Sequence, residues 1–208
     1  MTLLGKKGAA TRRAVLESAR LAFTQSGCDA GVREIAEKAG VTAMLVNRYF
    51  GSKENLFSEA VEMTLSAPGI ITQEVLRKSP KAEILCHDIS SALVEMTAPN
   101  VTPLDGFLIM LRSAGSKRAI GILREKFETH FSQPLAELLP EKNRQERSAL
   151  FLAVIAGFQL MRQIIELPAL TEAEPNDLTK FLEALFLVLA DEKPEGSSKT
   201  PLAGSNYT

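Results

Sequence analysis

The chain has 208 residues, of which 45% are hydrophobic and 24% charged, and its formal net charge is −1. This composition is ordinary for a globular protein of one large or two small domains. No apolar run approaches the roughly eighteen residues of a membrane span, and the first residues do not form a secretory signal. Cys28 and Cys86 show no metal spacing, so we expect a cytoplasmic protein with free thiols and no cofactor.

The first sixty residues are predicted to form short helices separated by glycines. We expect a flexible arm over 1–10, a helix over 11–26 and a second helix over 32–39. Gly40 ends this second helix, because glycine readily takes the left-handed conformation found at helix ends. A third helix is expected over 43–50. Two helices joined by a turn of about three or four residues that contains glycine have the spacing of a helix-turn-helix, whose second helix enters the DNA major groove.

The third helix has a clear inner and outer face. Thr42 offers a hydroxyl as its N-cap, and Gly51 and Ser52 close it before a further helix begins at Lys53. At 100° per residue, its large apolar side chains at 46 and 50 fall on one side and are expected to be buried. Arg and Asn side chains on the outer face suit contacts with guanine and adenine edges. The outward set is Met44, Leu45, Asn47 and Arg48; the alternative is an ordinary solvated face.

A longer pattern places this turn in a known family. The chain from Thr11 to about Val61 resembles the DNA-binding domain of the TetR (tetracycline-repressor) family of bacterial transcriptional regulators. Two positions differ from the usual pattern: Asn47 stands where a phosphate-contacting Tyr is common, and Gly31 where a Thr is frequent. The matching residues are Val15, Leu16, Ala19, Phe23, Gly27, Arg33, Glu34, Ile35, Ala36, Ala39, Gly40, Val41, Asn47, Tyr49, Phe50, Gly51, Ser52, Lys53, Glu54, Leu56 and Phe57.

The resemblance implies a set of DNA contacts. Arg33 matches a position that reaches a base from the second helix. Thr42, Tyr49 and Lys53 lie at helix starts or on a helix flank, where they can meet phosphate oxygens. The residues expected to contact DNA are Arg33, Thr42, Ala43, Met44, Leu45, Asn47, Arg48, Tyr49 and Lys53.

The charge distribution agrees with this placement. Residues 1–60 contain nine Lys and Arg against six Asp and Glu, hence +3, and the remainder contains fifteen against nineteen, hence −4. Phosphate binding needs local positive charge, and the modest excess lies where the turn motif is.

The rest of the chain reads as successive helices without strands or repeats. We expect them over 81–97, 103–114, 117–139, 143–166 and 176–191, with Pro134 kinking or splitting the third. The expected fold is all-α with about nine helices. A DNA-binding domain over 11–57 precedes a helical ligand-binding and dimerisation domain over 58–191. The tail, 192–208, is rich in Pro, Gly, Ser and Lys and is expected to be disordered.

Two C-terminal segments, 143–166 and 176–191, are apolar on more than one helical face. Such a helix buries one face in its own domain and another against something else. Paired half-sites on DNA need a two-fold axis, so we expect a homodimer with two such helices from each subunit. The alternative is that both are core helices of a monomer. The expected interface residues are Phe151, Ile155, Phe181, Leu185, Phe186 and Leu189.

The middle of the chain supplies large, deformable apolar side chains suited to a small hydrophobic ligand. Arg112 and Arg162 stand among apolar neighbours and could meet an anionic or polar group, although salt bridging would explain them equally well. Asp105, His130 and Gln159 are further polar candidates. The residues expected to line the pocket are Met96, Phe107, Met110, Leu111, Phe127, Phe158, Met161 and Arg162; for each apolar one, ordinary core packing is the alternative.

The pattern does not favour an enzyme. His87 directly follows Cys86, so on a helix the two side chains diverge by about 100° and cannot readily chelate one ion. His130 stands alone, and no glycine-rich phosphate loop occurs. We therefore expect a ligand-responsive transcriptional repressor that binds a palindromic operator as a homodimer and is released by a small hydrophobic inducer. A helical protein-interaction adaptor without DNA binding is the alternative.

Overall fold

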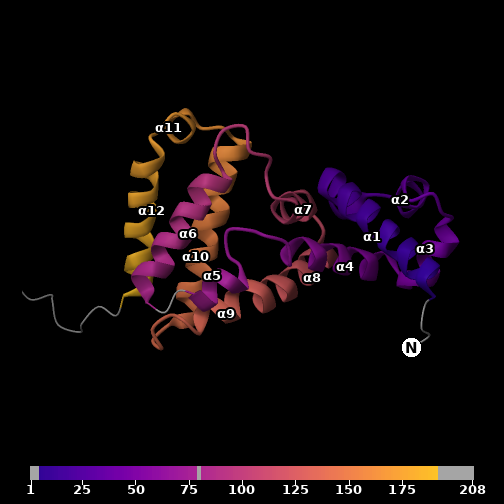
Figure 1. Cartoon of the computed structure of the whole chain (residues 1–208), viewed down its shortest axis with the longest axis horizontal. Coiled ribbons are helices and arrows are strands. Elements are labelled where there is room, and N and C mark those ends of the chain that lie inside the picture. Colours follow the sequence, from indigo (N-terminus) through magenta and orange to yellow (C-terminus); the bar gives the residue numbers. More distant parts are fainter. Residues whose placement is uncertain (1–4, 79–80, 192–208) are drawn as a thin grey trace, which may run out of the picture.

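The computed structural model describes residues 5–78 and 81–191, and its regular elements in these ranges are all helical. Figure 1 shows an elongated molecule, with α1, α2 and α3 at one end and α6, α10 and α12 at the other. No helix in the described ranges combines the length and apolarity that crossing a membrane requires. The helices are α1 (Lys6–Ser26), α2 (Val32–Lys38), α3 (Ala43–Phe50), α4 (Lys53–Leu65), α5 (Gln73–Lys78), α6 (Ala82–Met96), α7 (Asp105–Ser113), α8 (Lys117–Phe127), α9 (Gln133–Ala136), α10 (Arg144–Gln159), α11 (Pro168–Thr171) and α12 (Pro175–Ala190).

The expected helices are present, and the differences lie at their ends. Helix α1 begins at Lys6, not after an arm of ten residues, because the lysines and alanines of its first turns are strong helix formers. The segment 117–139, expected as one helix kinked or split by Pro134, is divided into α8 and α9 by a π-helical turn, Glu128–Ser132. Pro134 lies in the first turn of α9, where proline is tolerated. The short helices α5 and α11 were not expected. The tail over 192–208 lies outside the described residues.

Two hydrophobic cores organise the molecule. The first joins α1, α2, α3 and α4, called the head below, and it includes Val15, Phe23 and Phe50. Ile109 of α7 and Leu123 of α8 are buried in this same core. The second core is built from α5, α6, α9, α10 and α12. Helices α7 and α8 therefore pack on the head, although they follow it by about forty residues in the chain.

The head is held against α7 and α8 by close contacts. Gly27 ends α1 with a φ of 60°, and a Cβ built there would lie 2.4 Å from the carbonyl oxygen of Arg112. The Arg112 guanidinium donates to the carbonyl of Thr24, and the Cys28 N–H donates to Ser113 Oγ at 3.0 Å. Helices α1 and α7 thus meet backbone to backbone at this end, which leaves little freedom for independent movement.

Candidate nucleic-acid interface and ligand cavity

The turn between α2 and α3 has the expected local structure. Gly40 takes a φ of 67°, and Thr42 Oγ1 accepts a hydrogen bond from the Leu45 N–H at 3.3 Å. Gly51, with a φ of 78°, ends α3. Ser52 Oγ then accepts from the N–H at the start of α4, so the N-caps at both Thr42 and Ser52 are confirmed. These caps fix the orientation of α3 relative to α2 and α4.

Helix α3 buries one side and exposes the other. Val46 and Phe50 are buried, as predicted, and anchor the helix in the first core. The Met44 side chain is 78% exposed, and Arg48, one turn further on, is exposed on the same face. Asn47 is exposed beside them. The outward face is therefore free to enter a groove, as direct base reading requires.

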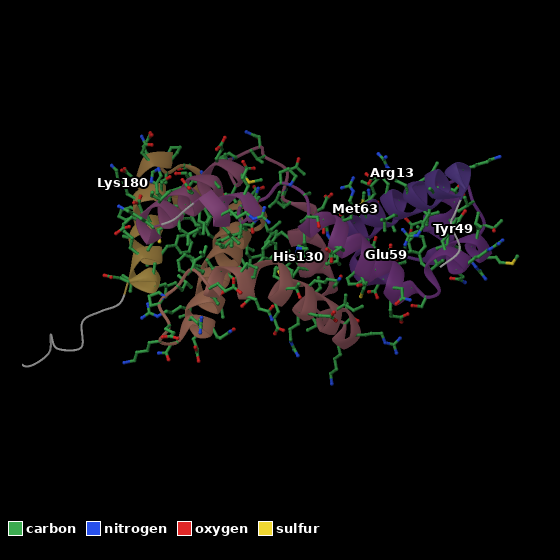
Figure 2. The ribbon with its side chains drawn as sticks, turned by 60° about the horizontal axis from the view of Figure 1, so that its bottom comes forward. Arg13, Tyr49, Glu59, Met63, His130 and Lys180 are labelled. Atoms are coloured by element: carbon green, nitrogen blue, oxygen red, sulfur yellow. The ribbon has the colours of Figure 1, made fainter. Side chains whose placement is uncertain are left out.

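The remaining predicted contacts surround this face at lower exposure. Arg33 on α2 and Thr42 are exposed, whereas Tyr49 and Lys53 are half-buried. Tyr49 packs edge-on against Phe50, with ring centroids 6.5 Å apart. Figure 2 shows Tyr49 near one extremity of the molecule and Lys180, on α12, at the other. Ala43 and Leu45 are also half-buried, so their part in DNA binding stays a prediction.

The positive charges of the head divide into paired and free groups. Arg12 binds Glu59 and stacks over the Phe50 ring, 4.6 Å from its centroid, and Lys38 pairs with Glu34. Within 5–78 and 81–191, by contrast, no carboxylate forms an ion pair with the side chains of Arg33, Arg48 or Lys53. Basic groups without an internal partner are the ones available to phosphates and base edges.

A cavity of about 370 Å³ lies between the two cores. Its wall is mostly apolar and comes from α4, the 67–71 connection, α7, the α8–α9 region and α10. The predicted residues Phe107, Met110 and Phe127 line it, together with the polar candidates Asp105 and Gln159. Its volume and apolar lining suit a small hydrophobic ligand.

Five of the predicted lining residues lie elsewhere. Met161 and Leu111 point outward, and Met96 and Phe158 pack against the second core. Arg162 is 3% exposed and donates to the carbonyls of Val94 and Leu170 and to Thr97 Oγ1. Burial lowers the pKa of its guanidinium from the ordinary value. Arg162 is therefore a structural cross-link, because its guanidinium binds backbone carbonyls of α6 and α11 and lies 5.6 Å from the centroid of the Phe158 ring.

Other lining residues could not be identified from periodicity alone. The connection after α4, where Pro68 and Gly69 stop the helix, runs along the cavity, and α1 contributes a charged residue, Arg20. Phe131 belongs to the π-helical turn Glu128–Ser132, and Phe127 directly precedes this turn; their rings meet edge to face at 5.4 Å in the cavity wall. Such turns are frequent at functional sites. The lining residues not predicted for the pocket are Arg20, Met63, Thr64, Leu65, Ala67, Pro68, Gly69, Ile70, Ile71, Leu104, Gly106, Leu152, Ile155 and Ala156.

The two histidines each lie beside a glutamate, and Cys86 is buried. His130 Nε2 lies 2.8 Å from Glu62 Oε1, which also places α4 against the π-helical turn, and Lys126 binds the second oxygen of Glu62. His87 lies 3.1 Å from Glu183. Burial raises the pKa of the Cys86 thiol to about 12, so this thiol is not a nucleophile near neutral pH.

The predicted dimer residues divide into buried and exposed sets. Phe151 and Phe186 are completely buried in the second core, and Ile155 faces the cavity. None of these three can reach a partner, because each is already covered by its own chain. Leu189 is half-buried on the same core. The exposed apolar side chains of α10, α12 and the turn after α10 are Leu150, Met161, Ile164, Ile165, Phe181, Leu185 and Val188.

A helix-turn-helix head joined to an all-helical C-terminal domain is the architecture of a class of DNA-binding transcriptional regulators. The family description "Bacterial regulatory proteins, tetR family" matches residues 15–60, and "Tetracyclin repressor-like, C-terminal domain" matches residues 91–187. The HTH-type transcriptional regulatory protein RaaS of Mycobacterium tuberculosis is 30% identical over 172 residues, which cover 78% of this chain and 76% of that protein. The chain belongs to the TetR family of transcriptional regulators.

Solved structures share the fold at low sequence identity. NalD, the secondary repressor of the MexAB-OprM multidrug efflux pump in Pseudomonas aeruginosa, aligns with a TM-score of 0.62 and 18% identity over 88% of this chain and 97% of that one. The multidrug binding protein EbrR, complexed with proflavin, aligns with a TM-score of 0.57 and 16% identity over 86% and 99% of the two chains. At these identities the likeness establishes the architecture and not the ligand.

Proposed function

We propose that this regulator is a homodimeric repressor that leaves its operator when a small, mainly apolar molecule fills the cavity between the two cores. The observation that carries the proposal is the combination of a free, exposed reading face on α3 with a cavity whose wall includes α1 and α4 side chains. Binding in the cavity would then act directly on two helices of the head. As a DNA-binding regulator it would act in the cytoplasm.

The DNA-reading part of the proposal rests on α3. Met44 and Arg48 lie one turn apart on the exposed face, and neither has a partner within the described residues. An Arg at such a position can bind guanine with two hydrogen bonds, and loss of such a contact costs about 1–3 kcal/mol of discrimination. The unpaired Lys53, at the first turn of α4, would hold a phosphate.

The dimer part of the proposal rests on an exposed apolar stripe. Phe181, Leu185 and Val188 are more than half exposed and recur at i, i+4 and i+7 on α12. Leu150 and Met161 extend the apolar surface along α10 and the turn that follows it. Contiguous apolar surface of this kind marks an interaction site, and a second copy of the chain would give the two-fold axis that paired half-sites need.

The ligand part of the proposal rests on the geometry of the cavity wall. Phe107 and Asp105 on α7 face the same space as Leu65 at the end of α4. Gly106 lies so close to α4 that a Cβ there would be 3.2 Å from Leu65. A ligand that prefers another spacing of α4 and α7 would shift the population of head positions, and a coupling of about 1–3 kcal/mol would make a useful switch.

Binding to the DNA upstream of the chain's own gene tests the proposal. In fluorescence anisotropy, wild-type protein should bind this fragment more tightly than unrelated DNA of equal length. Arg48→Ala should lose about 1–3 kcal/mol on the specific fragment and little on unrelated DNA. Arg124→Ala, which removes an exposed charge on α8, is the matched control and should bind like the wild type. Equal affinity of the wild type for both fragments would contradict the proposal.

A further inference from the structure

One wall of the cavity contains an ion cluster that joins the head to α7. Arg20 donates through Nη1 to Asp105 Oδ2, and through Nε to both Glu17 oxygens at 3.2 Å. Its Nη2 also donates to Glu17. Arg20 and Asp105 both line the cavity, whereas Glu17 lies behind Arg20 on α1. Two carboxylates share one guanidinium, and the exposed Arg13, one turn before Glu17 on α1, is the next cation and attracts the Glu17 carboxylate from outside the cavity.

The remaining wall is mainly aliphatic, with three aromatic rings and one amide that has a nitrogen without a hydrogen-bond partner in the described part of the chain. The rings of Phe107, Phe127 and Phe131 face the cavity. Gln159 is 5% exposed and lines it, and its Nε2 has no hydrogen-bond partner within the described residues. A buried donor without a partner costs free energy. A carboxylate and aromatic faces thus surround one space.

We propose that the effector is a lipophilic cation whose ammonium binds Asp105 in place of the Arg20 guanidinium, so that ligand entry breaks the ion pair between α1 and α7. This inference rests on the proposed function, since it assigns the ligand class and the switch of the same cavity. The ligand is aromatic or aliphatic in its body and has one protonated amine.

The charges of the wall favour a cation over an anion. All three nitrogens of the Arg20 guanidinium already donate to carboxylates. To bind Arg20, an anionic ligand would have to displace one carboxylate and would then lie beside both carboxylates. A cationic ligand is attracted instead, because the two negative charges of Asp105 and Glu17 exceed the one positive charge of Arg20. Aromatic faces also attract cations and repel anions. Arg112 and Arg162, the cations expected from the sequence to meet an anionic ligand, are committed to backbone carbonyls outside the cavity.

Helix α1 would transmit the effect of losing the Arg20–Asp105 ion pair to the DNA-binding surface. One side of α1 contacts α7 through this pair. Two turns earlier on the same helix, Arg12 binds Glu59 of α4 and stacks on Phe50, which anchors α3. Loss of the pair frees the part of α1 around Arg20 from α7, whereas the Gly27 end of α1 stays held against Arg112. A tilt of α1 about that end would change the support of both α3 and α4, the two helices that would meet the operator.

Three probes of similar size and different charge test the inference without DNA. They are biphenyl-4-ylmethylamine, which is cationic at neutral pH, biphenyl-4-ylmethanol, which is neutral, and biphenyl-4-carboxylate, which is anionic. By calorimetry on the full chain, the amine should bind at least about tenfold more tightly than the alcohol, because it gains a charge-assisted hydrogen bond, and the carboxylate should bind most weakly. Tighter binding of the carboxylate than of the amine would overturn the inference.

Variants of the cluster assign the effect to Asp105. Asp105→Asn should remove the tenfold advantage of the amine and leave the affinity for the alcohol unchanged. Glu59→Gln, which removes a carboxylate paired with α1 outside the cavity, is the matched control and should keep the advantage. Arg20→Gln should tighten amine binding, because it removes the competing guanidinium, and it decides the matter if Asp105→Asn does not fold. An amine affinity unchanged in Asp105→Asn and in Arg20→Gln would contradict the assignment.

The two proposals fail in different ways. Amine binding with the predicted dependence on Asp105, but no specific DNA binding, would overturn the proposed repressor and leave the cation site standing. Specific DNA binding that the amine does not weaken, in a protein that does not bind the amine by calorimetry, would overturn the cation site alone.

Discussion

Phe186 of α12 lies face to face with Phe151 of α10, with ring centroids 4.6 Å apart and planes only 6° from parallel. Both side chains are fully buried within one chain. The contact fixes the rotation of α12 about its axis and turns Phe181 and Leu185 outward. The surface proposed for dimerisation is thus set by a stacking contact inside the subunit.

The first prediction concerns this rotation. Leu185→Glu should split the dimer, because it would bury an unpaired charge at the two-fold interface, while the helical circular dichroism is retained. Thr179→Glu, on the flank of the same helix, is the matched control and should remain dimeric. Sedimentation velocity at micromolar concentration distinguishes the states. A Leu185→Glu protein that stays dimeric would show that the interface lies elsewhere.

The helical segments were predictable from the sequence, but the orientation of the last two was not. In α12, apolar residues occupy both the stripe through Leu178, Leu182 and Phe186 and the stripe through Phe181 and Leu185. Neighbouring positions on a helix differ by about 100°, so a stripe displaced by one residue faces a different partner. Only packing against α6 and α10 decides which stripe is internal. The sequence pattern therefore identified both segments as helices and did not separate their inward face from their outward one.

Helix α3 was predicted more completely, because the residues that start and end it act on neighbouring positions in the sequence. Gly40, Thr42 and Gly51 each act through their own backbone or the next turn, and the structure confirms all three. The cavity wall depends on contacts between segments far apart in the chain, such as Arg20 with Asp105. Periodicity within one helix carries no information on such pairs. This is why Phe107 was identified and Arg20 was not.

The second prediction concerns the joint between the head and α7. Gly27→Ala would put a side chain at positive φ and against the carbonyl of Arg112. The positive φ alone costs a residue with a side chain about 1–2 kcal/mol. The free energy of unfolding should therefore fall by more than this amount, because the clash with Arg112 adds to it. Gly121→Ala is the matched control, since it lies in α8 with open space at its Cβ. This control should stabilise by up to about 1 kcal/mol. Urea unfolding measures both; equal stability of the two variants would contradict the close contact.

The third prediction concerns the cavity. Ala156→Phe should fill part of it and weaken binding of biphenyl-4-ylmethanol at least about tenfold, with an overpacking cost of about 1–3 kcal/mol in stability. DNA binding should change little, because the added ring carries no charge and leaves the Arg20–Asp105 ion pair in place. Ala169→Phe, at an exposed site on α11, is the control for added apolar surface. Unchanged probe affinity in Ala156→Phe, measured by calorimetry, would place the ligand outside this cavity.

The fourth prediction concerns acid stability. A hydrogen bond from Lys126, and then one from His130, lower the pKa of the Glu62 carboxyl below its ordinary value of 4.5. A carboxyl whose folded pKa is lowered stabilises the protein fully above its unfolded pKa and loses this contribution as the pH falls through the folded pKa. Glu62→Gln should therefore reduce the melting temperature near neutral pH and make it less dependent on pH below 4.5. Thermal melts from neutral to acidic pH check this.

The control for that prediction is Glu125→Gln, which removes an exposed carboxylate from the same region of the chain. Its melting temperature should follow the wild type at every pH. If Glu62→Gln and Glu125→Gln gave the same profile, the contacts of Glu62 with α8 and the π-helical turn would contribute nothing to stability.

In the proposed function, two copies of α3 read one symmetric site and ligand binding releases them. Selection of bound sequences from random DNA, repeated with and without biphenyl-4-ylmethylamine, tests both parts in one measurement. We expect an inverted repeat with half-site centres about one helical turn, or a multiple of it, apart, which is lost when the amine is present. Recovery of no repeated sequence, or of the same inverted repeat with equal enrichment at saturating amine, would contradict it.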